Sequence, residues 1–344
     1  MRIAIATDAW EPQVNGVVTT LRQTRDELER QGHQVLMITP EGRRTMPCPT
    51  YPEIRLTLFA RRSVARDLAE FQPTCVHIAT EGTLGLAARR YCTRLKVPFT
   101  TAYHTQFPEY LRARFPVPVS WTGAALRWFH RPAVRTMVPT DGIRKLLENR
   151  GFANVVLWSR GVATDVFKPD EPVDYEFDRP VWVYVGRVAV EKNIEAFLEL
   201  ELEGSKVVIG DGPDRERLVD EYPDCNFLGY KFGRDLARHL AGADVFVFPS
   251  KTDTFGIVML EAMACGLPVA AYPVTGPIDV VRNGETGILH NDLTQACNEA
   301  LKLDGNAAVR FAGKRSWQRC TEQFVANLAP ANECQGETIE QAAP

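Results

Sequence analysis

The sequence contains no apolar run that approaches the roughly 20 residues needed by a membrane-spanning helix. Its first apolar stretch, residues 3–6, is soon interrupted by Asp8 and Glu11, and no small-residue cleavage site follows as it would in a secretory signal. These absences argue against a membrane-spanning or secreted protein. They predict a cytoplasmic chain.

Clustered cysteines are also missing. No two cysteines have the C-x-x-C spacing, and no nearby histidine completes the ligand set of a structural zinc site. Several cysteines stand among apolar residues, where a free thiol behaves as a small core side chain. We therefore expect all eight to be free: Cys48, Cys75, Cys92, Cys225, Cys265, Cys297, Cys320 and Cys334.

Three common ligand motifs are lacking as well. There is no P-loop and no G-x-G-x-x-G, so ATP hydrolysis and ordinary NAD binding have no sequence support. No D-x-D pair indicates a bound divalent metal, and Asp211 and Asp214 bracket Gly212-Pro213 as they would in a simple turn. The sequence thus predicts neither a metal nor a cofactor.

The charge is divided unevenly along the 344 residues, although the net charge is only −3. Residues 1–165 carry 23 Lys and Arg against 14 Asp and Glu, whereas residues 166–344 carry 17 against 29. A chain of this length is expected to form two domains, and their opposite charges indicate different partners. The basic half could face nucleic acid, an anionic membrane or the other half.

Short apolar runs alternate with helix-period segments throughout, which is typical of parallel βαβ units. A stretch rich in Pro, Asp and Glu, residues 168–180, reads as a linker between two such sets. The expected class is α/β, with two doubly wound domains and a cleft between them. The expected strands are residues 3–7, 35–39, 75–79, 99–103 and 136–139, then 181–185, 206–209, 245–249, 269–272 and 287–289.

The loop after the first expected strand ends at Asn15-Gly16. Asn15 is placed to cap a helix that Gly32 ends. The free N–H groups at such a helix start can bind a phosphate, although a simple turn and cap is the commoner meaning.

In the second half, the first strand runs into Arg187 and, five residues later, Lys192. A guanidinium and an ammonium at a strand-to-helix turn can hold a diphosphate and offset its charge as it leaves.

The most specific block is residues 249–269, in which a strand, a small-polar loop and a helix from about Phe255 to Gly266 follow one another. Asp253 precedes the helix and Glu261 lies within its apolar sequence. A carboxylate is costly to bury unless it is hydrogen-bonded, and the vicinal hydroxyls of a ribose are suitable donors. The N–H groups of the helix start face the same ligand, and they belong to Thr254, Phe255 and Gly256.

With these blocks the sequence resembles the family 4 retaining glycosyltransferases, which have the GT-B fold of two Rossmann-like domains facing a cleft. The resemblance covers nearly the whole chain. It implies that Asp253 lies near the donor sugar and Glu261 at the ribose. It further implies that Arg187 and Lys192 bind the diphosphate and that the loop of Asn15 and Gly16 lies at the donor phosphates.

The resemblance also implies that His104, which follows a first-domain strand, lies beside the donor sugar. Transfer would retain the anomeric configuration, with the leaving diphosphate helping to deprotonate the acceptor hydroxyl. The implied layout is an acceptor-binding domain (1–165), a nucleotide-sugar-binding domain (166–315), a helix returning to the first domain (316–330) and a disordered tail (331–344).

Shorter matches resemble the bacterial glucosyl-, mannosyl- and sulfoquinovosyl-transferases that act on lipids. They are Glu81-Gly82 and residues 103–108, 159–162 and 252–256. Three positions depart from the usual pattern: Asp253 replaces Glu, Ala163 replaces Asp, and residues 275–279 replace a Gly-Gly turn. The resemblance implies that the shorter Asp253 and the altered turn both lie near the sugar, so the identity of the donor stays open.

We expect a UDP- or GDP-linked hexose donor and a lipid acceptor, with diacylglycerol first and a polyprenyl or inositol lipid second. Arginines mixed with aromatics between residues 107 and 132 predict an anchor that docks on the inner face of the plasma membrane, unless the aromatics simply pack the domain. The residues assigned to the acceptor or the membrane are Glu81, Arg112, Arg114, Trp121, Arg127 and Trp128.

Other functions stay open at this point. A soluble or polysaccharide acceptor and a nucleotide-sugar epimerase of the same fold are the main alternatives. A sugar phosphorylase would need a Schiff-base lysine that no motif nominates, and a nucleic-acid-binding protein would need a recognisable module. The oligomeric state is not predicted.

Overall fold

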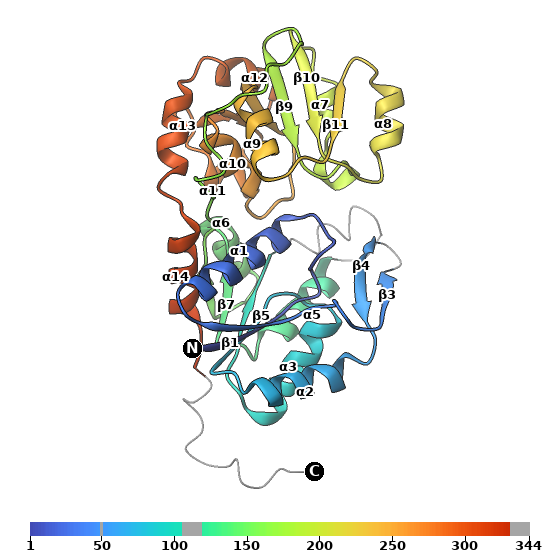
Figure 1. The fold of residues 1–344 in the computed structure, drawn as a ribbon, viewed down its shortest axis with the longest axis vertical. Helices are drawn as coiled ribbons and strands as arrows, with labels where there is room; N and C mark the ends of the chain where they lie inside the picture. Colours follow the sequence, from blue (N-terminus) through green and yellow to red (C-terminus); the bar gives the residue numbers. More distant parts are fainter. Residues whose placement is uncertain (49–50, 105–118, 331–344) are drawn as a thin grey trace. The chain divides into compact units, whose positions relative to one another are not determined.

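A computed structural model describes residues 1–48, 51–104 and 119–330, without the side chains of residues 51–54 and 119–121 (Figure 1). The chain divides into two compact units. The N-terminal unit holds residues 1–159 and, of the described C-terminal residues, 320–330; the C-terminal unit holds residues 160–319. The sequence placed these boundaries at 165/166 and 315/316. They differ because Val162 pairs with Ser316 in a β-bridge, which keeps residues 160–165 with the C-terminal unit.

The N-terminal unit contains a six-stranded parallel sheet in the order β2-β1-β5-β6-β7-β8. The last four residues of β1 are buried on both faces, because helices cover the two sides of a parallel sheet. The strands are β1 (Arg2–Ala6), β2 (Gln34–Ile38), β5 (Cys75–Ile78), β6 (Thr100–Ala102), β7 (Arg135–Val138) and β8 (Val155–Leu157). The helices are α1 (Gly16–Arg30), α2 (Ala60–Phe71), α3 (Thr83–Leu95), α5 (Val119–His130) and α6 (Asp141–Asn149).

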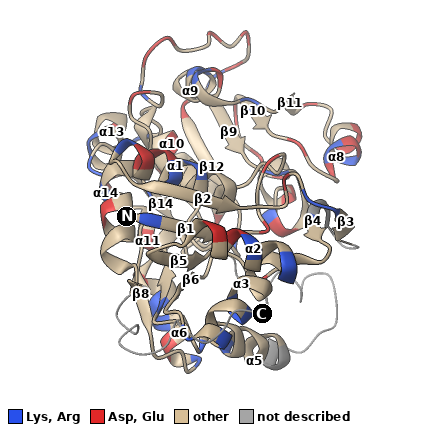
Figure 2. Cartoon of the chain, turned by 60° about the horizontal axis from the view of Figure 1, so that its bottom comes forward, with Lys and Arg blue, Asp and Glu red and all other residues tan. Residues whose placement is uncertain are grey.

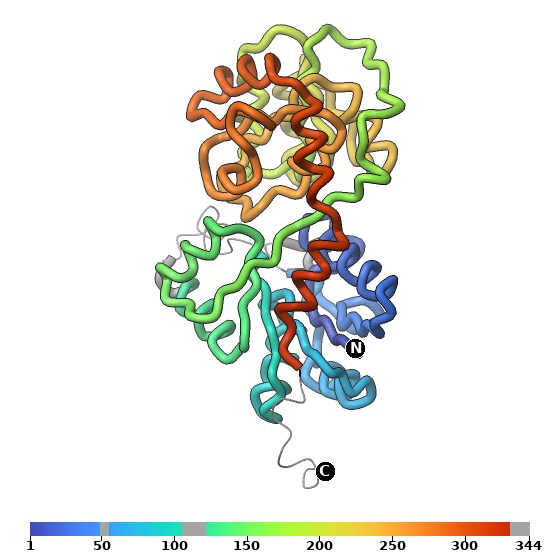
Figure 3. Tube along the Cα trace, turned by 90° about the vertical axis from the view of Figure 1, so that its left-hand side faces the viewer, coloured from blue at the N-terminus to red at the C-terminus, as the bar shows by residue number. Residues whose placement is uncertain are grey.

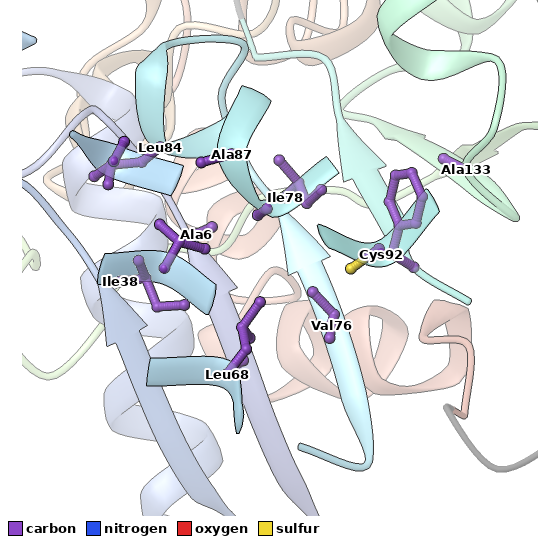
Figure 4. Close-up of a cluster of buried hydrophobic side chains, with 14 of the residues drawn as sticks. Ala6, Ile38, Leu68, Val76, Ile78, Leu84, Ala87, Cys92 and Ala133 are labelled. Atoms are coloured by element: carbon purple, nitrogen blue, oxygen red, sulfur yellow. The ribbon is translucent and has the colours of Figure 1, made fainter. Parts of the chain in front are cut away.

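Small and branched side chains fill the core beneath α2 and α3. Ala6 of β1 and Ile78 of β5 cluster with Leu68 of α2 and Ala87 of α3 (Figure 4). The alanines let α3 approach the sheet closely. Gly85 of α3 packs against the loop after β5, since a Cβ there would lie 1.8 Å from the Thr80 carbonyl oxygen.

The C-terminal unit repeats the architecture with the order β11-β10-β9-β12-β13-β14, all parallel. All five residues of β9 are buried. Its strands are β9 (Val181–Val185), β10 (Ser205–Ile209), β11 (Asn226–Gly229), β12 (Val245–Phe248), β13 (Val269–Ala271) and β14 (Gly287–Leu289). Its helical segments are η1 (Val190–Lys192), α7 (Glu195–Leu198), α8 (Arg215–Glu221), α9 (Gly233–Ala241), α10 (Ile257–Ala264), α11 (Pro277–Val280), α12 (Leu293–Ala300) and α13 (Gly305–Ala312).

These two sheets confirm the predicted pair of doubly wound α/β domains. Every strand expected from the sequence is present to within one or two residues. The hairpin β3 (Thr45–Cys48) and β4 (Tyr51–Thr57), and the edge strands β8 and β11, were not predicted.

The linker prediction for residues 168–180 was wrong. Val173 donates its backbone N–H to the carbonyl of Arg238 at 2.9 Å, and the Tyr175 hydroxyl donates to the carbonyl of His239 at 3.1 Å. Both acceptors belong to α9. The segment is therefore part of the C-terminal unit.

The last helix, α14 (Trp317–Asn327), ends in the N-terminal unit. The ring centroid of Phe324 lies 4.8 Å from that of Trp158 and 4.9 Å from that of His77. Beyond the helix, Pro330 forms a bridge with Cys75 of β5, and the red tube in Figure 3 can be followed to this point. The core of the first sheet is thus completed by residues from the other end of the sequence.

The seven cysteines in the described ranges are free thiols, and Cys334 lies outside these ranges. Burial raises the pKa of Cys92 and of Cys297 to about 12, so both stay protonated and serve as core side chains. Of the helices in the described ranges, none has the length and apolar character that crossing a bilayer requires.

Candidate active site

Two loops meet at the carboxyl edge of the sheet in the C-terminal unit. One follows β9 and the other follows β12. The Lys192 Nζ atom lies 2.6 Å from Asp253 Oδ1, and Asn193 donates through Nδ2 to the carbonyl of Pro249 at 3.0 Å. A basic group from the first loop and an acidic group from the second are therefore held together where ligands bind in open α/β sheets.

Only one of the two carboxylate oxygens of Asp253 has a hydrogen-bond partner among the described residues. Its Oδ1 atom accepts from Lys192, whereas Oδ2 is buried and has no hydrogen-bond partner within the described residues. A buried acceptor that lacks a hydrogen bond costs about 1–3 kcal/mol of stability. A ligand hydroxyl that donates to Oδ2 would remove this cost.

Arg187 is oriented by a residue that the sequence analysis did not single out. Its Nε lies 3.8 Å from Glu191 Oε1, and the Glu191 side chain is 3% exposed while that of Arg187 is 27% exposed. The buried carboxylate directs a partly exposed cation. Only the i,i+4 spacing of Arg187 and Glu191 could have signalled this pair.

The helix that carries Glu261 begins at Ile257, two residues later than predicted, because Gly256 has a φ of +79°. A Cβ at Gly256 would lie 2.9 Å from Phe248 Cζ, so both the backbone angle and the space require glycine. Thr254 and Phe255 are buried in the turn before the helix. This turn fixes the direction in which α10 leaves the sheet.

Glu261 lies in the second turn of α10 and is partly exposed. Its carboxylate has no hydrogen-bond or ion-pair partner in the part of the chain that the structure describes, and burial raises its pKa to about 7. Desolvation is the cause of this shift and disfavours the charged carboxylate. Hydrogen-bond donors of a ligand would stabilise the charged form.

The N-terminal unit confirms the cap predicted at Asn15. Its Oδ1 atom accepts from the backbone N–H groups of Val17 and Val18, both at 3.0 Å. Gly16 is the exposed first residue of α1. The role of this loop at the donor phosphates stays a prediction.

His104 follows β6 and lies against aromatic side chains at the end of the sheet. Its ring centroid is 5.6 Å from that of Trp158 in an edge-to-face arrangement. Trp158 in turn packs on Phe324 of α14. The C-terminal helix therefore supports the side chain that the sequence nominated for the donor sugar.

Glu81 lies in the loop between β5 and α3. Its Oε1 atom is 3.2 Å from Nε2 of His130, a fully buried residue at the end of α5. No sequence pattern identified His130, because 49 residues separate it from its partner.

The residues predicted to form a membrane anchor are only partly described. Arg112 and Arg114 lie outside the described residues, as does the side chain of Trp121. Trp128 is 56% exposed with the Arg89 guanidinium 3.9 Å from its ring centroid, and Arg127 is exposed, whereas Phe129 is buried. Core packing thus accounts for Phe129 and leaves Trp128 and Arg127 at the surface.

Asp211 forms the turn that the sequence favoured over a metal site. Its Oδ1 atom accepts from the Gly212 N–H at 2.7 Å, and its carbonyl accepts from Val188. Within the described ranges, no three His, Cys, Asp or Glu side chains gather as a metal site requires.

Comparison with known proteins agrees with this geometry. The family described as "Glycosyltransferase Family 4" matches residues 14–166, and "Glycosyl transferases group 1" matches residues 179–303. A GDP-mannose-dependent alpha-mannosyltransferase of Mycobacterium tuberculosis is 32% identical over 317 residues, covering 84% of this chain and 83% of its own. The chain belongs to glycosyltransferase family 4.

Other relatives of this family 4 enzyme carry different names. A sulfoquinovosyl transferase of Arabidopsis thaliana is 33% identical, covering 86% of this chain and 67% of its own. An alpha-monoglucosyldiacylglycerol synthase of Streptococcus pneumoniae is 27% identical, covering 99% and 90%. The solved sucrose-phosphate synthase of Thermosynechococcus elongatus, 20% identical with a TM-score of 0.73 over 94% of this chain and 97% of its own, shows the GT-B fold.

The family confirms the resemblance seen in the sequence. This family 4 enzyme is a hexosyltransferase that uses a nucleotide-sugar donor, and its two parallel-sheet units are those of GT-B.

Proposed function

We propose that this family 4 enzyme transfers a hexose from a UDP- or GDP-linked donor to a hydroxyl of a membrane lipid, with retention of configuration. The observation that supports binding of the nucleotide-sugar donor is the pair of carboxylates at α10, Asp253 and Glu261. Asp253 Oδ2 and the Glu261 carboxylate have no partner among the described residues. Asp253 precedes α10 and contacts Lys192, and Glu261 lies in the second turn of the helix.

In this proposal four charged side chains of the C-terminal unit bind the donor. Asp253 accepts a hydroxyl of the transferred sugar, and Glu261 accepts the ribose hydroxyls. Arg187 and Lys192 bind the diphosphate and stabilise the charge that grows on it as the sugar leaves. The backbone N–H groups at the start of α10, which no side chain caps, add further donors.

The proposed contribution of the N-terminal unit to the donor rests on the family resemblance. His104 lies beside the sugar, and the loop of Asn15 and Gly16 lies at the phosphates. The packing of Trp158 on His104 supports a fixed ring.

The lipid half of the proposal rests on two observations. One relative that spans 99% of this chain is named a monoglucosyldiacylglycerol synthase. The N-terminal unit also exposes apolar side chains among arginines: Phe59 at the start of α2 is 78% exposed, and Trp128 of α5 is 56% exposed. Figure 2 shows basic positions on α2, where Arg61, Arg62 and Arg66 are exposed.

Such a surface suits reversible docking on an anionic leaflet. Each basic group near the membrane contributes about 1 kcal/mol, so a few arginines suffice. The enzyme is then a peripheral protein of the inner face of the plasma membrane, and diacylglycerol is the first acceptor to test.

Labelled UDP- and GDP-sugars should be incubated with dioleoylglycerol in vesicles of phosphatidylglycerol or of phosphatidylcholine. We expect one donor to give an organic-soluble product, faster on phosphatidylglycerol and slower at high salt. The variant Arg61→Ser/Arg62→Ser should lose rate on anionic vesicles but not on detergent-dispersed dioleoylglycerol, while Arg217→Ser in the C-terminal unit is the control. Label that appears only in a water-soluble glycoside would contradict the lipid acceptor, and donor conversion without any acceptor would indicate an epimerase.

A further inference from the structure

Glu81 lies where the strand order of the N-terminal sheet reverses. The chain passes from β1 to β2 on one side and later returns to β5 on the other side of β1. Ligands of open α/β sheets bind outside the carboxyl ends of the strands at such a switch point. The loop that follows β5 at this edge contains Thr80, Glu81 and Gly82.

The backbone of this loop is fixed by Asp8, which follows β1. A Cβ at Gly82 would lie 2.3 Å from Asp8 Cγ, so these two segments of the chain are in direct contact. The Asp8 carboxylate accepts four hydrogen bonds across the gap between the strands, although burial raises its pKa. The donors are Thr80 Oγ1, Thr83 Oγ1, the Leu84 N–H and the Gly85 N–H, at 2.9–3.3 Å.

The Glu81 side chain is fixed from the other direction by His130. Because a carboxylate oxygen accepts, Nε2 of His130 is assigned as the donor to Glu81 Oε1, at 3.2 Å. Nδ1 of the ring lies 2.8 Å from Thr101 Oγ1, which in turn lies 3.1 Å from Thr136 Oγ1 on the next strand. Both ring nitrogens are used, and the ring is 0% exposed.

The second carboxylate oxygen of Glu81, Oε2, is available to a ligand. The side chain is 31% exposed, and Oε2 has no hydrogen-bond partner within the described residues. A carboxylate held by its loop and by one of its two oxygens offers the other in a fixed position. The basic balance of residues 1–165 disfavours a cationic ligand there, so a neutral hydroxyl is the better match.

We propose that Glu81 binds a hydroxyl of the sugar acceptor through Oε2, and that the buried His130 is the positioning residue that holds Glu81 for this contact. The inference rests on the proposed function, because the hydroxyl belongs to the acceptor of that reaction. It adds a residue pair that acts on the acceptor and not on the donor.

The test uses the full-length chain, its preferred nucleotide sugar and dioleoylglycerol in phosphatidylglycerol vesicles. Glu81→Gln should raise the KM for dioleoylglycerol about 10- to 100-fold, because a hydrogen bond to a charged group is lost. The donor KM and the slow hydrolysis of the donor without vesicles should not change. Glu29→Gln, which removes an exposed carboxylate from α1, is the matched control.

Two variants separate positioning by His130 from simple support of the fold. His130→Phe removes the N–H donor to Glu81 and should raise the KM for the acceptor. His130→Gln keeps an N–H donor and should leave this KM close to the wild-type value. In the Glu81→Gln background, His130→Phe should have little further effect on that KM, because the two residues act as one unit. Thermal melting monitors folding of each variant.

An unchanged acceptor KM in Glu81→Gln would overturn the inference. An equal rise of the acceptor KM in His130→Gln and His130→Phe would overturn the role of His130. So would a full additional rise of this KM in the Glu81→Gln/His130→Phe double variant. If the wild-type chain transfers sugar only to a soluble acceptor, the proposed lipid acceptor fails, and the same KM comparison on that soluble acceptor then decides the role of Glu81.

Discussion

Glu261 differs from an ordinary surface glutamate in two respects that bear on donor binding. It lacks a partner among the described residues, and burial raises its pKa to about 7. The folded pKa lies above the ordinary value of 4.5, so the unfolded chain loses the proton first as the pH rises. At about 1.4 kcal/mol per pH unit, the free energy of unfolding falls by at most about 3 kcal/mol between these two pH values.

The same pKa predicts how donor affinity depends on pH. Ribose hydroxyls donate to the carboxylate more strongly than to the carboxyl, so affinity should rise from about pH 6 to about pH 8 and then level off. The phosphates of a nucleotide sugar do not titrate in this range. Calorimetric measurement of the donor Kd across this range checks the slope.

Glu261→Gln should flatten this pH dependence, and Glu261→Ala should weaken donor binding about 10- to 100-fold. Equal pH dependence in the wild type and in Glu261→Gln would show that another group titrates. Unchanged donor affinity in Glu261→Ala would remove Glu261 from the proposed site.

At the residue scale, the sequence identified groups that stand out against their neighbours. Glu261 interrupts an apolar helix, and Lys192 follows a strand end. Asp8 and His130 were not identified, since their partners lie far away in the sequence. Asp8 is 75 residues from Thr83, and only the sheet order brings them together.

At the element scale, α10 depends on one backbone angle at its start. Gly256→Ala should destabilise the chain by more than about 1–2 kcal/mol, because the left-handed angle is strained for alanine and the new methyl group meets Phe248. The donor KM should rise as the start of α10 shifts. Thermal unfolding and donor kinetics measure the two effects.

Gly284 provides a matched control in the same unit. It has the same φ of +79°, but a Cβ there meets nothing within 4 Å. Gly284→Ala should therefore show the strain alone, with unchanged donor kinetics. Equal effects of the two substitutions would contradict the packing of Gly256 against Phe248.

Elements were predictable where burial was uniform, as in β9, all of whose residues are apolar and buried. The hairpin of β3 and β4 was missed, since Pro47 lies within it and its strands are partly exposed. The acidic stretch 168–180 was misread as a linker, because Tyr175 meets its partner 64 residues later. Local composition does not record such contacts.

At the scale of the whole molecule, the enzyme is expected to work without a divalent metal. Lys192 and Arg187 lie at the carboxyl edge of the sheet, where they would stabilise the charge that grows on the leaving diphosphate. Transfer should therefore persist in excess EDTA, measured as product per minute. Activity that disappears with EDTA and returns with magnesium or manganese would contradict this role for the two cations.

The central claim is a retaining hexosyl transfer to a lipid hydroxyl, and the anomeric configuration of the first product tests it most directly. The full-length chain is incubated with an α-linked UDP- or GDP-hexose and dioleoylglycerol in phosphatidylglycerol vesicles. The one-bond carbon–hydrogen coupling at the anomeric carbon of the extracted glycolipid is then measured by NMR. The account predicts an α-glycosyl lipid, whereas a β-glycosyl lipid, or no glycolipid despite turnover of the donor, would contradict it.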